Sequence, residues 1–232
     1  MRGKALVLAK SSIYENLGGN MQNKGLFISF EGIDGSGKSA MMRKVAKWLV
    51  ENGFHVFSTR EPGGTHQGRE LRKMLLHSEV GGMDDVSETL LFALDRAFHC
   101  QRTIKPALTA GKVVLSDRFS DSTLAYQGGG RGMDISALQS LNSFATSGLE
   151  PDITILLDID PEVAQCRLSD GKDRMEQENI DFFCRVAKAY RQLASENPTR
   201  IKVIDASSDM EAVFKDILTV IQPLLQGGEN NG

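Results

Sequence analysis

The sequence predicts one α/β domain in which helices cover both faces of a five-stranded parallel sheet. Five short apolar runs alternate with segments of helical periodicity, and this alternation is typical of a parallel sheet. A glycine-rich segment directly follows the first apolar run. No linker rich in Pro, Gly or Ser divides the 232 residues and no internal repeat occurs, so one domain is favoured over two.

Strand and helix signals alternate in the first part of the chain. Residues 26–31 (LFISFE) are a short apolar run that indicates a buried strand. Apolar side chains then recur with the spacing of one helix face from Met42 to Leu49, and this pattern stops before Gly53. Residues 54–59 (FHVFST) alternate in polarity, as a strand does.

The middle of the chain continues the alternation with longer helices. A helix is expected at about 67–76 and a longer one at about 84–110. A third strand is expected at 113–116. The glycine-rich run QGGGRG (127–132) is expected to form a loop that precedes a helix at 135–145.

The last two strands lie in the final third of the chain. Prolines bracket the apolar run 153–159 (ITILLDI), which indicates the fourth strand. The charged segment at about 169–177 is expected to form a short lid, and a helix then runs to about residue 196. A fifth strand at 201–204 and an amphipathic helix to about residue 225 complete the pattern.

Composition and charge exclude several classes of protein. The domain is expected to span 25–226, with a flexible extension at 1–24 and a tail at 227–232. A formal net charge of −3 argues against nucleic acid as a partner, and no apolar run is long enough for a membrane span. Three widely spaced cysteines fit a reducing compartment, so a cytoplasmic protein is expected.

One segment carries a specific chemical signal. Residues 32–39 (GIDGSGKS) match the phosphate-binding pattern G-x-x-x-x-G-K-[ST]. The glycines let successive backbone N–H groups point at one anion, the Lys reaches the β- and γ-phosphates, and the final hydroxyl binds Mg²⁺. The segment follows a strand and opens a helix, which predicts a three-layer P-loop NTPase fold. The expected triphosphate-binding residues are Gly32, Ile33, Asp34, Gly35, Ser36, Gly37, Lys38 and Ser39.

Two further features favour a kinase over a GTPase. The guanine-binding pattern N-K-x-D is absent, and the single D-x-x-G lies inside the phosphate-binding segment. Arginines instead follow two strands, in TREPGGT (59–65) and DRFSDST (117–123), and ligands of parallel sheets bind at the carboxyl ends of strands. Since Arg binds phosphate bidentately, these segments suit a second substrate that carries a phosphate.

Taken together, these motifs resemble bacterial thymidylate kinase, of the P-loop nucleoside monophosphate kinase superfamily. The matching segments are EGIDGSGKS, TREPGGT, LLFALDR, SDRFSDSTLAYQGGGRG, PDITILLDIDPE and DRMEQE, and the likeness covers about residues 25–225. The resemblance implies transfer of the γ-phosphoryl group of ATP to dTMP, which gives dTDP and ADP for dTTP synthesis, with Mg²⁺ as cofactor. It also implies a cytoplasmic homodimer.

The resemblance implies a role for individual residues of the acceptor site. The expected dTMP-binding residues are Arg60, Pro62, Gly63, Arg72, Phe92, Arg96, Arg118, Thr123 and Gln127. Phe92 would stack on thymine, Gln127 would hydrogen-bond its N3/O4 edge, and Arg118 would bind the acceptor phosphate. The alternatives are a core position for Phe92, a solvated helix position for Arg72, and a surface ion pair for Arg96.

Catalytic and metal-binding residues follow from the same resemblance. The expected catalytic residues are Asp34, Lys38, Arg118, Arg167, Lys172 and Arg174. Family members with an Arg directly after the carboxylate at Asp34 use that Arg in catalysis, but here Gly35 takes its place, so the lid is expected to supply the additional charge. A solvated charge run is the alternative for the lid cations. Ser39 and Asp117 are the expected metal ligands, unless Asp117 only orients Arg118.

Three other functions share part of this pattern. Another nucleotide or nucleoside kinase would act on a different base, and a regulatory ATP-binding module would bind ATP without an acceptor. A nucleic-acid-dependent ATPase would bind DNA in a salt-sensitive way, which the net charge of −3 does not favour.

Overall fold

The computed structural model describes residues 25–76, 83–168 and 173–226. The predicted extension (1–24), the tail (227–232) and the first part of the predicted lid (169–172) lie outside the described residues. Five strands in the described part form one parallel sheet with the order β2-β3-β1-β4-β5, which confirms the predicted fold class. The strands are β1 (Leu26–Glu31), β2 (Val56–Arg60), β3 (Val113–Asp117), β4 (Ile153–Asp158) and β5 (Ile201–Asp205).

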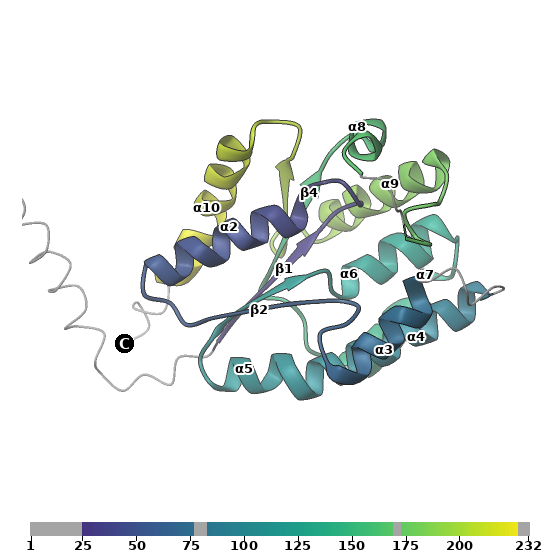
Figure 1. Cartoon of the computed structure of the whole chain (residues 1–232), viewed down its shortest axis with the longest axis horizontal. Coiled ribbons are helices and arrows are strands. Elements are labelled where there is room, and N and C mark those ends of the chain that lie inside the picture. Colours follow the sequence, from purple (N-terminus) through teal and green to yellow (C-terminus); the bar gives the residue numbers. More distant parts are fainter. Residues whose placement is uncertain (1–24, 77–82, 169–172, 227–232) are drawn as a thin grey trace, which may run out of the picture.

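Helices cover both faces of this sheet (Figure 1). On one face α2 packs along β1, β2 and β3, and α10 packs beside α2 and β5. On the other face α5 contacts β3, and α9 contacts β4 and β5. The helical elements are α2 (Lys38–Glu51), α3 (His66–Leu76), α4 (Asp85–His99), η2 (Cys100–Ile104), α5 (Lys105–Thr109), α6 (Ser120–Thr123), η3 (Leu124–Gly130), α7 (Ile135–Thr146), α8 (Pro161–Cys166), α9 (Ile180–Glu196) and α10 (Met210–Gln226).

The alternation of side chains along β1 explains why both faces need cover. Ile28 and Phe30 are fully buried in the cluster that includes the apolar stripe of α2. Phe27 points into a second cluster together with residues of η2 and α5. A strand that is buried on both faces has a nearly continuous apolar sequence, and this is the pattern of LFISFE.

The strand register brings functional segments to one edge of the sheet. Arg60 of β2 pairs with Asp117 of β3, and Asp117 pairs with Phe30 of β1. The phosphate-binding segment begins two residues after Phe30. The carboxyl ends of β2, β3 and β1 therefore lie side by side, as ligand binding in a parallel sheet requires.

The expected loop at QGGGRG is wrong, because this run continues a helix. Residues 124–130 form the π-helical element η3, which packs against α9. A Cβ placed on Gly129 would lie 2.3 Å from the Cβ of Ala189, and one on Gly130 would lie 2.4 Å from the ring of Phe182. These glycines therefore permit close contact between two helices and do not mark a flexible segment.

Other differences from the expected elements are smaller. The long helix at 84–110 is continuous but passes through a π-helical turn at Cys100–Ile104. The short helix α8 was not expected; Asp160 caps it by accepting a hydrogen bond from the N–H of Glu162, and Pro161 stands at its first position. β2 begins two residues later than expected, at Val56.

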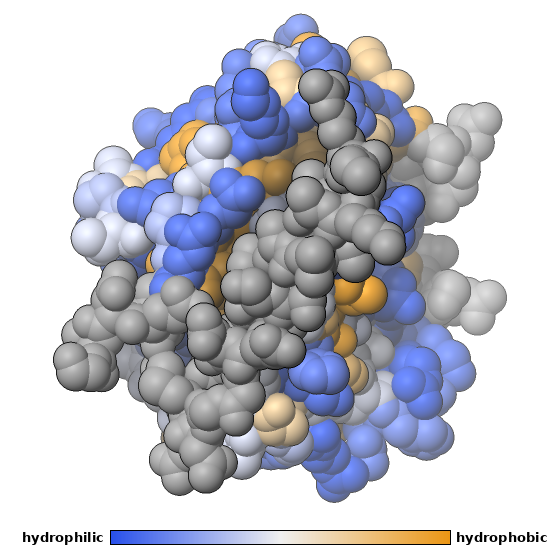
Figure 2. Space-filling view, turned by 90° about the vertical axis from the view of Figure 1, so that its left-hand side faces the viewer, coloured by the Kyte–Doolittle hydropathy of each residue, from blue (hydrophilic) through white to orange (hydrophobic). Residues whose placement is uncertain are grey.

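Figure 2 shows the end of the molecule away from these strand ends, at the left of Figure 1. The coloured part of this face has both hydrophilic and hydrophobic areas. Within the described residues, no helix combines the length and apolar character that a bilayer span requires.

Candidate active site

Two cavities lie at the carboxyl edge of the sheet and share a wall. The first, of about 240 Å³, is lined by residues from the ends of β2 and β3, from α3, α4 and η3, and from the segment 173–176. The second, of about 560 Å³, lies over the phosphate-binding segment. The residues that line both cavities are Asp34, Lys38, Ser39 and Glu176.

The phosphate-binding segment wraps the first turn of α2. The Nζ atom of Lys38 donates to the carbonyl oxygen of Ile33 at 2.8 Å and lies 3.8 Å from the carboxylate of Asp34. Gly35 has a φ of +82°, and a Cβ there would lie 2.1 Å from the carbonyl oxygen of Ala164, so only glycine lets α8 pack on this segment. Burial and the nearby charge of Arg118 lower the pKa of Lys38, because both disfavour its charged form. An anion bound at this point would therefore stabilise the ammonium group.

The two expected metal ligands, Ser39 and Asp117, lie next to each other. The Ser39 hydroxyl donates a hydrogen bond to the Asp117 carboxylate. Among the described residues no cluster of three His, Cys, Asp or Glu side chains is arranged to hold a metal ion. An ion here would take its other ligands from phosphate and water, which is how Mg²⁺ is usually bound, and the two oxygen donors fit that ion.

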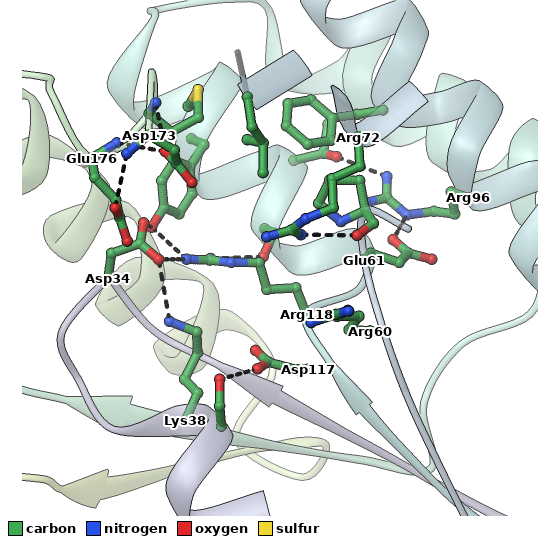
Figure 3. Close-up of a pocket in the computed structure, with 18 of the residues that line it drawn as sticks. Asp34, Lys38, Arg60, Glu61, Arg72, Arg96, Asp117, Arg118, Asp173 and Glu176 are labelled. Carbon is green, nitrogen blue, oxygen red and sulfur yellow. Dashed lines mark hydrogen bonds and ion pairs between the residues drawn. The ribbon is translucent and has the colours of Figure 1, made fainter. Parts of the chain in front are cut away.

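Arg118 lies at the centre of the first cavity, with its guanidinium aimed at Asp34 (Figure 3). Its Nη2 atom donates to Asp34 at 2.6 Å and to the hydroxyl of Tyr126 at 2.9 Å. Tyr126 also donates to Asp34, at 2.8 Å. Burial alone would raise the pKa of Asp34, but the charges of Arg118 and Lys38 and these hydrogen bonds outweigh it and hold that pKa well below its usual range.

Sequence reasoning missed two side chains that hold Arg118. Tyr126 lies in the segment AYQGGGRG, where nothing in the sequence indicates a contact with Arg118. Glu31, the last residue of β1, is fully buried and accepts hydrogen bonds from the N–H of Phe119 at 2.6 Å and the hydroxyl of Ser122 at 2.6 Å. Burial, followed by the charge of Asp121, raises the pKa of Glu31 to about 7. The sequence did not indicate this role for Glu31, because Phe119 and Ser122, which donate to it, lie far away along the chain.

Arg96 is buried inside the protein, so the surface ion pair considered for it is wrong. Its guanidinium donates to Glu61 at 2.9 Å, to Thr123 and Asn142 at 2.7 Å each, and to the carbonyl oxygen of Phe119 at 3.0 Å. It lines the first cavity while it ties the end of β2 to α6 and α7. The sequence did not reveal this network, because its members come from four separate segments.

The other expected acceptor residues gather around the same cavity. Phe92 is partly buried and lines the wall, so it is not a core residue. Arg72 lines the cavity and donates to the carbonyl oxygen of Pro62 at 3.0 Å, which excludes a purely solvated position. Arg60 is exposed and Gln127 is buried, and both line this cavity.

The structure separates the expected lid cations. Arg167 donates to the carbonyl oxygen of Ala206 at 3.3 Å and lines the second cavity. Arg174 donates to Glu88 at 2.6 Å, behind the first cavity. Lys172 lies outside the described residues. Of the two cations that can be placed, Arg167 therefore lines the second cavity, whereas Arg174 lines neither cavity and is paired with Glu88.

Comparison with known proteins gives one consistent result. The family model described as "Thymidylate kinase" matches residues 30–217. The chain is 47% identical over 203 residues to a thymidylate kinase of Bifidobacterium longum, covering 86% of this chain and 98% of that protein. It is 43% identical over 209 residues to one from Solidesulfovibrio magneticus, covering 86% and 100%. The crystal structure of thymidylate kinase from Ehrlichia chaffeensis matches with a TM-score of 0.72 and 36% identity, covering 85% of this chain and 98% of that one.

Proposed function

The chain belongs to the thymidylate kinase family, and from this premise we propose how its two cavities divide the reaction. It is an ATP-dependent nucleoside monophosphate kinase that transfers the γ-phosphoryl group of ATP to dTMP, giving dTDP and ADP. The observation that carries the assignment of sites is the shared wall: Asp34, Lys38 and Ser39 line both cavities, so a donor and an acceptor would meet there.

The second cavity takes the donor. ATP places its phosphates on Gly32–Ser39, where backbone N–H groups at the start of α2 and the charge of Lys38 favour anions. The nucleoside part would lie toward Arg167 and Ala206, which also line this cavity. Ser39 and Asp117 would hold Mg²⁺, which when bound neutralises charge on the phosphates.

The first cavity takes the acceptor. Phe92 offers a ring face to thymine, and Thr123 and Gln127 are the polar groups beside it. Arg60, Arg72 and Arg118 line the same cavity and supply charge for the phosphate of dTMP; Pro62 and Gly63 form the backbone next to them. Arg96 acts here mainly through the side chains that it holds.

Transfer depends on position and charge more than on covalent chemistry. Lys38 and Arg118 stand on either side of Asp34, at 3.8 Å and 2.6 Å, so both cations face the place where the two cavities meet. They stabilise the charge that develops on the transferring group. Arg167, Lys172 and Arg174 are the further candidates for this role, and Arg167 lines the cavity that we propose for the donor.

The test is an ADP-release assay on dTMP, dUMP, dGMP and dCMP side by side. We expect acceptor-dependent release with dTMP to exceed that with dGMP and dCMP by a large factor. Equal rates on dTMP and dGMP would overturn the thymine assignment. ATP binding without any acceptor-dependent release would show a regulatory module.

The assembly and location are further parts of the proposal. Val86, Leu90 and Leu94 are exposed at four-residue spacing along α4, and such an apolar stripe favours a homodimer. Light scattering should show a dimer for the wild type and a monomer for Leu90→Glu if the stripe is the interface.

The location and the domain bounds are also part of the proposal. The described cysteines are free thiols, which favours the cytoplasm. We also propose one catalytic domain at 25–226, since the described elements share one sheet.

A further inference from the structure

A buried carboxylate behind the acceptor cavity has no part in the reaction as described so far. Glu88 lies on α4, one turn before Phe92, and its side chain is 1% exposed. It accepts hydrogen bonds from Gln127 Nε2 at 2.9 Å, from Arg131 Nη2 at 3.2 Å and from Arg174 Nη2 at 2.6 Å. Side chains from η3, from the residue that follows it and from the segment 173–178 thus converge on one group.

The contact with Gln127 fixes which end of its carboxamide is available. A carboxamide has an NH₂ donor end and an oxygen acceptor end, and Glu88 takes the donor end. Gln127 lines the acceptor cavity, so its oxygen is the atom that it can present to a base. Thymine and uracil carry a hydrogen on N3, whereas cytosine has an acceptor at N3. An acceptor held at this point therefore favours a base with an N3–H.

The contact with Arg174 fastens a second wall of the same cavity. Arg174 donates through Nε to the carbonyl oxygen of Leu75 at 2.8 Å and through its backbone N–H to that of Leu76 at 3.2 Å. Leu76 and Met175 both line the acceptor cavity. Glu88 therefore holds the segment 173–178 against the end of α3, beside the place proposed for the base.

The charge of Glu88 matches this arrangement. Burial alone would raise its pKa, but the hydrogen bonds from Gln127 and Arg131 and the charge of Arg131 outweigh burial and lower the pKa. The group therefore stays ionised at neutral pH and can only accept hydrogen bonds. An amide at position 88 would turn its NH₂ group toward Gln127. It would then favour a Gln127 side chain whose oxygen faces residue 88 and whose NH₂ faces the cavity.

We propose that Glu88 is a positioning residue for recognition of the acceptor base: it orients Gln127 so that the carboxamide oxygen faces the N3–H of thymine, and it fastens the segment 173–178 over the same cavity. This rests on the proposed function, because it assumes that the first cavity binds dTMP. Glu88 touches no substrate itself and acts through Gln127 and Arg174.

The test is the Glu88→Gln variant of the full chain, assayed with dTMP and dCMP. We expect the dTMP:dCMP ratio of kcat/KM to fall about tenfold or more, through a higher KM for dTMP, since one misplaced buried hydrogen bond has an effect of this size. Asp85→Asn is the matched control, because it removes one negative charge from the same helix and from the same Arg131, which lies 3.3 Å away. It should keep the wild-type ratio.

The reciprocal exchange Glu88→Gln with Gln127→Glu gives an independent readout. It keeps the composition and again places an oxygen acceptor toward the base, so the preference for dTMP should return. A folded Glu88→Gln enzyme with the wild-type ratio would overturn the proposal. If Glu88→Gln does not fold, an active exchange variant that has lost the dTMP preference overturns it. Absence of dTMP-dependent ADP release from the wild type would instead contradict the proposed function.

Discussion

The carboxylate of Glu31 accepts a hydrogen bond from the backbone N–H of Phe119 at 2.6 Å, and this bond fixes the residue that follows Arg118. Arg118 has a φ of +73°, a backbone conformation that side chains other than glycine rarely adopt. Glu31 also accepts from Ser122 and Tyr190, and both hydroxyls also contact the Arg118 guanidinium. One buried carboxylate thus supports both the backbone and the side chain of the central arginine.

Replacing Glu31 with Gln should impair turnover more than binding. The amide NH₂ would face donors that now meet an oxygen, so the segment around Arg118 would shift. We expect kcat to fall about tenfold or more, with a smaller change in the KM for dTMP. Steady-state kinetics checks this. Ser29→Ala is the control, because Ser29 donates to Glu31 at 3.1 Å from within β1 and should leave kcat near wild type. An unchanged kcat in Glu31→Gln would contradict the role.

Stability should also report the titration of Glu31. Its pKa is raised from 4.5 to about 7 by burial and by the charge of Asp121. The folded state therefore binds this proton more tightly than the unfolded state, and the contribution of Glu31 to stability falls as the pH rises from about 4.5 to about 7. The loss is about 3 kcal/mol at most.

Urea unfolding of wild type and Glu31→Gln between pH 5 and pH 8 measures this effect. The free energy of unfolding of wild type relative to the variant should decrease with rising pH and level off above pH 7, since other groups cancel in the difference. A difference that does not change with pH would show that Glu31 keeps an ordinary pKa.

Arg118→Ala should remove most of the activity. The substitution takes away a cation at the point where the cavities meet, and loss of one such donor typically lowers kcat about 100-fold or more. Arg118→Lys keeps the charge but loses the guanidinium fork, whose Nη2 donates to Asp34 and Tyr126 and whose Nη1 donates to the carbonyl oxygen of Gly32. Its kcat should therefore lie between those of the wild type and Arg118→Ala. Thermal melting of each variant separates lost chemistry from lost fold. Near-normal turnover of Arg118→Ala would contradict the catalytic assignment.

Packing at Gly129 gives a prediction about stability alone. Gly129→Ala brings a Cβ to 2.3 Å from that of Ala189, and such overpacking costs about 1–3 kcal/mol. Ala189→Gly frees the space but weakens α9 by about 1 kcal/mol. The double variant should be less destabilised than the sum of the single variants, as measured by urea unfolding. Strict additivity would show that η3 and α9 do not meet at this point.

Residues whose type and spacing are dictated by chemistry could be predicted from the sequence. Lys38 and Ser39 belong to a pattern that few other arrangements satisfy, and β1 and α2 around them follow from apolar periodicity. Arg118 could be placed because it directly follows a strand, at the edge where ligands bind.

Residues that depend on distant partners could not be predicted in this way. A run of glycines is typical of a flexible loop and also of close helix packing, and only Ala189 and Phe182, more than fifty residues away, distinguish the two at η3. Glu31 and Glu88 are ordinary acidic residues in the sequence; their roles appear only when donors from other segments surround them. The charged run around Arg174 indicated a lid cation, whereas the side chain of Arg174 pairs with Glu88 on α4.

The register that aligns Arg60, Asp117 and Phe30 across β2, β3 and β1 limits where this chain can gain or lose residues. A one-residue insertion inside any of these strands would turn its terminal side chain to the opposite face of the sheet. The turn at Asn52–Gly53, between α2 and β2, lies at the other end of the strands and can absorb such changes. Length differences among homologous chains should therefore concentrate at that end, away from the residues that handle phosphate.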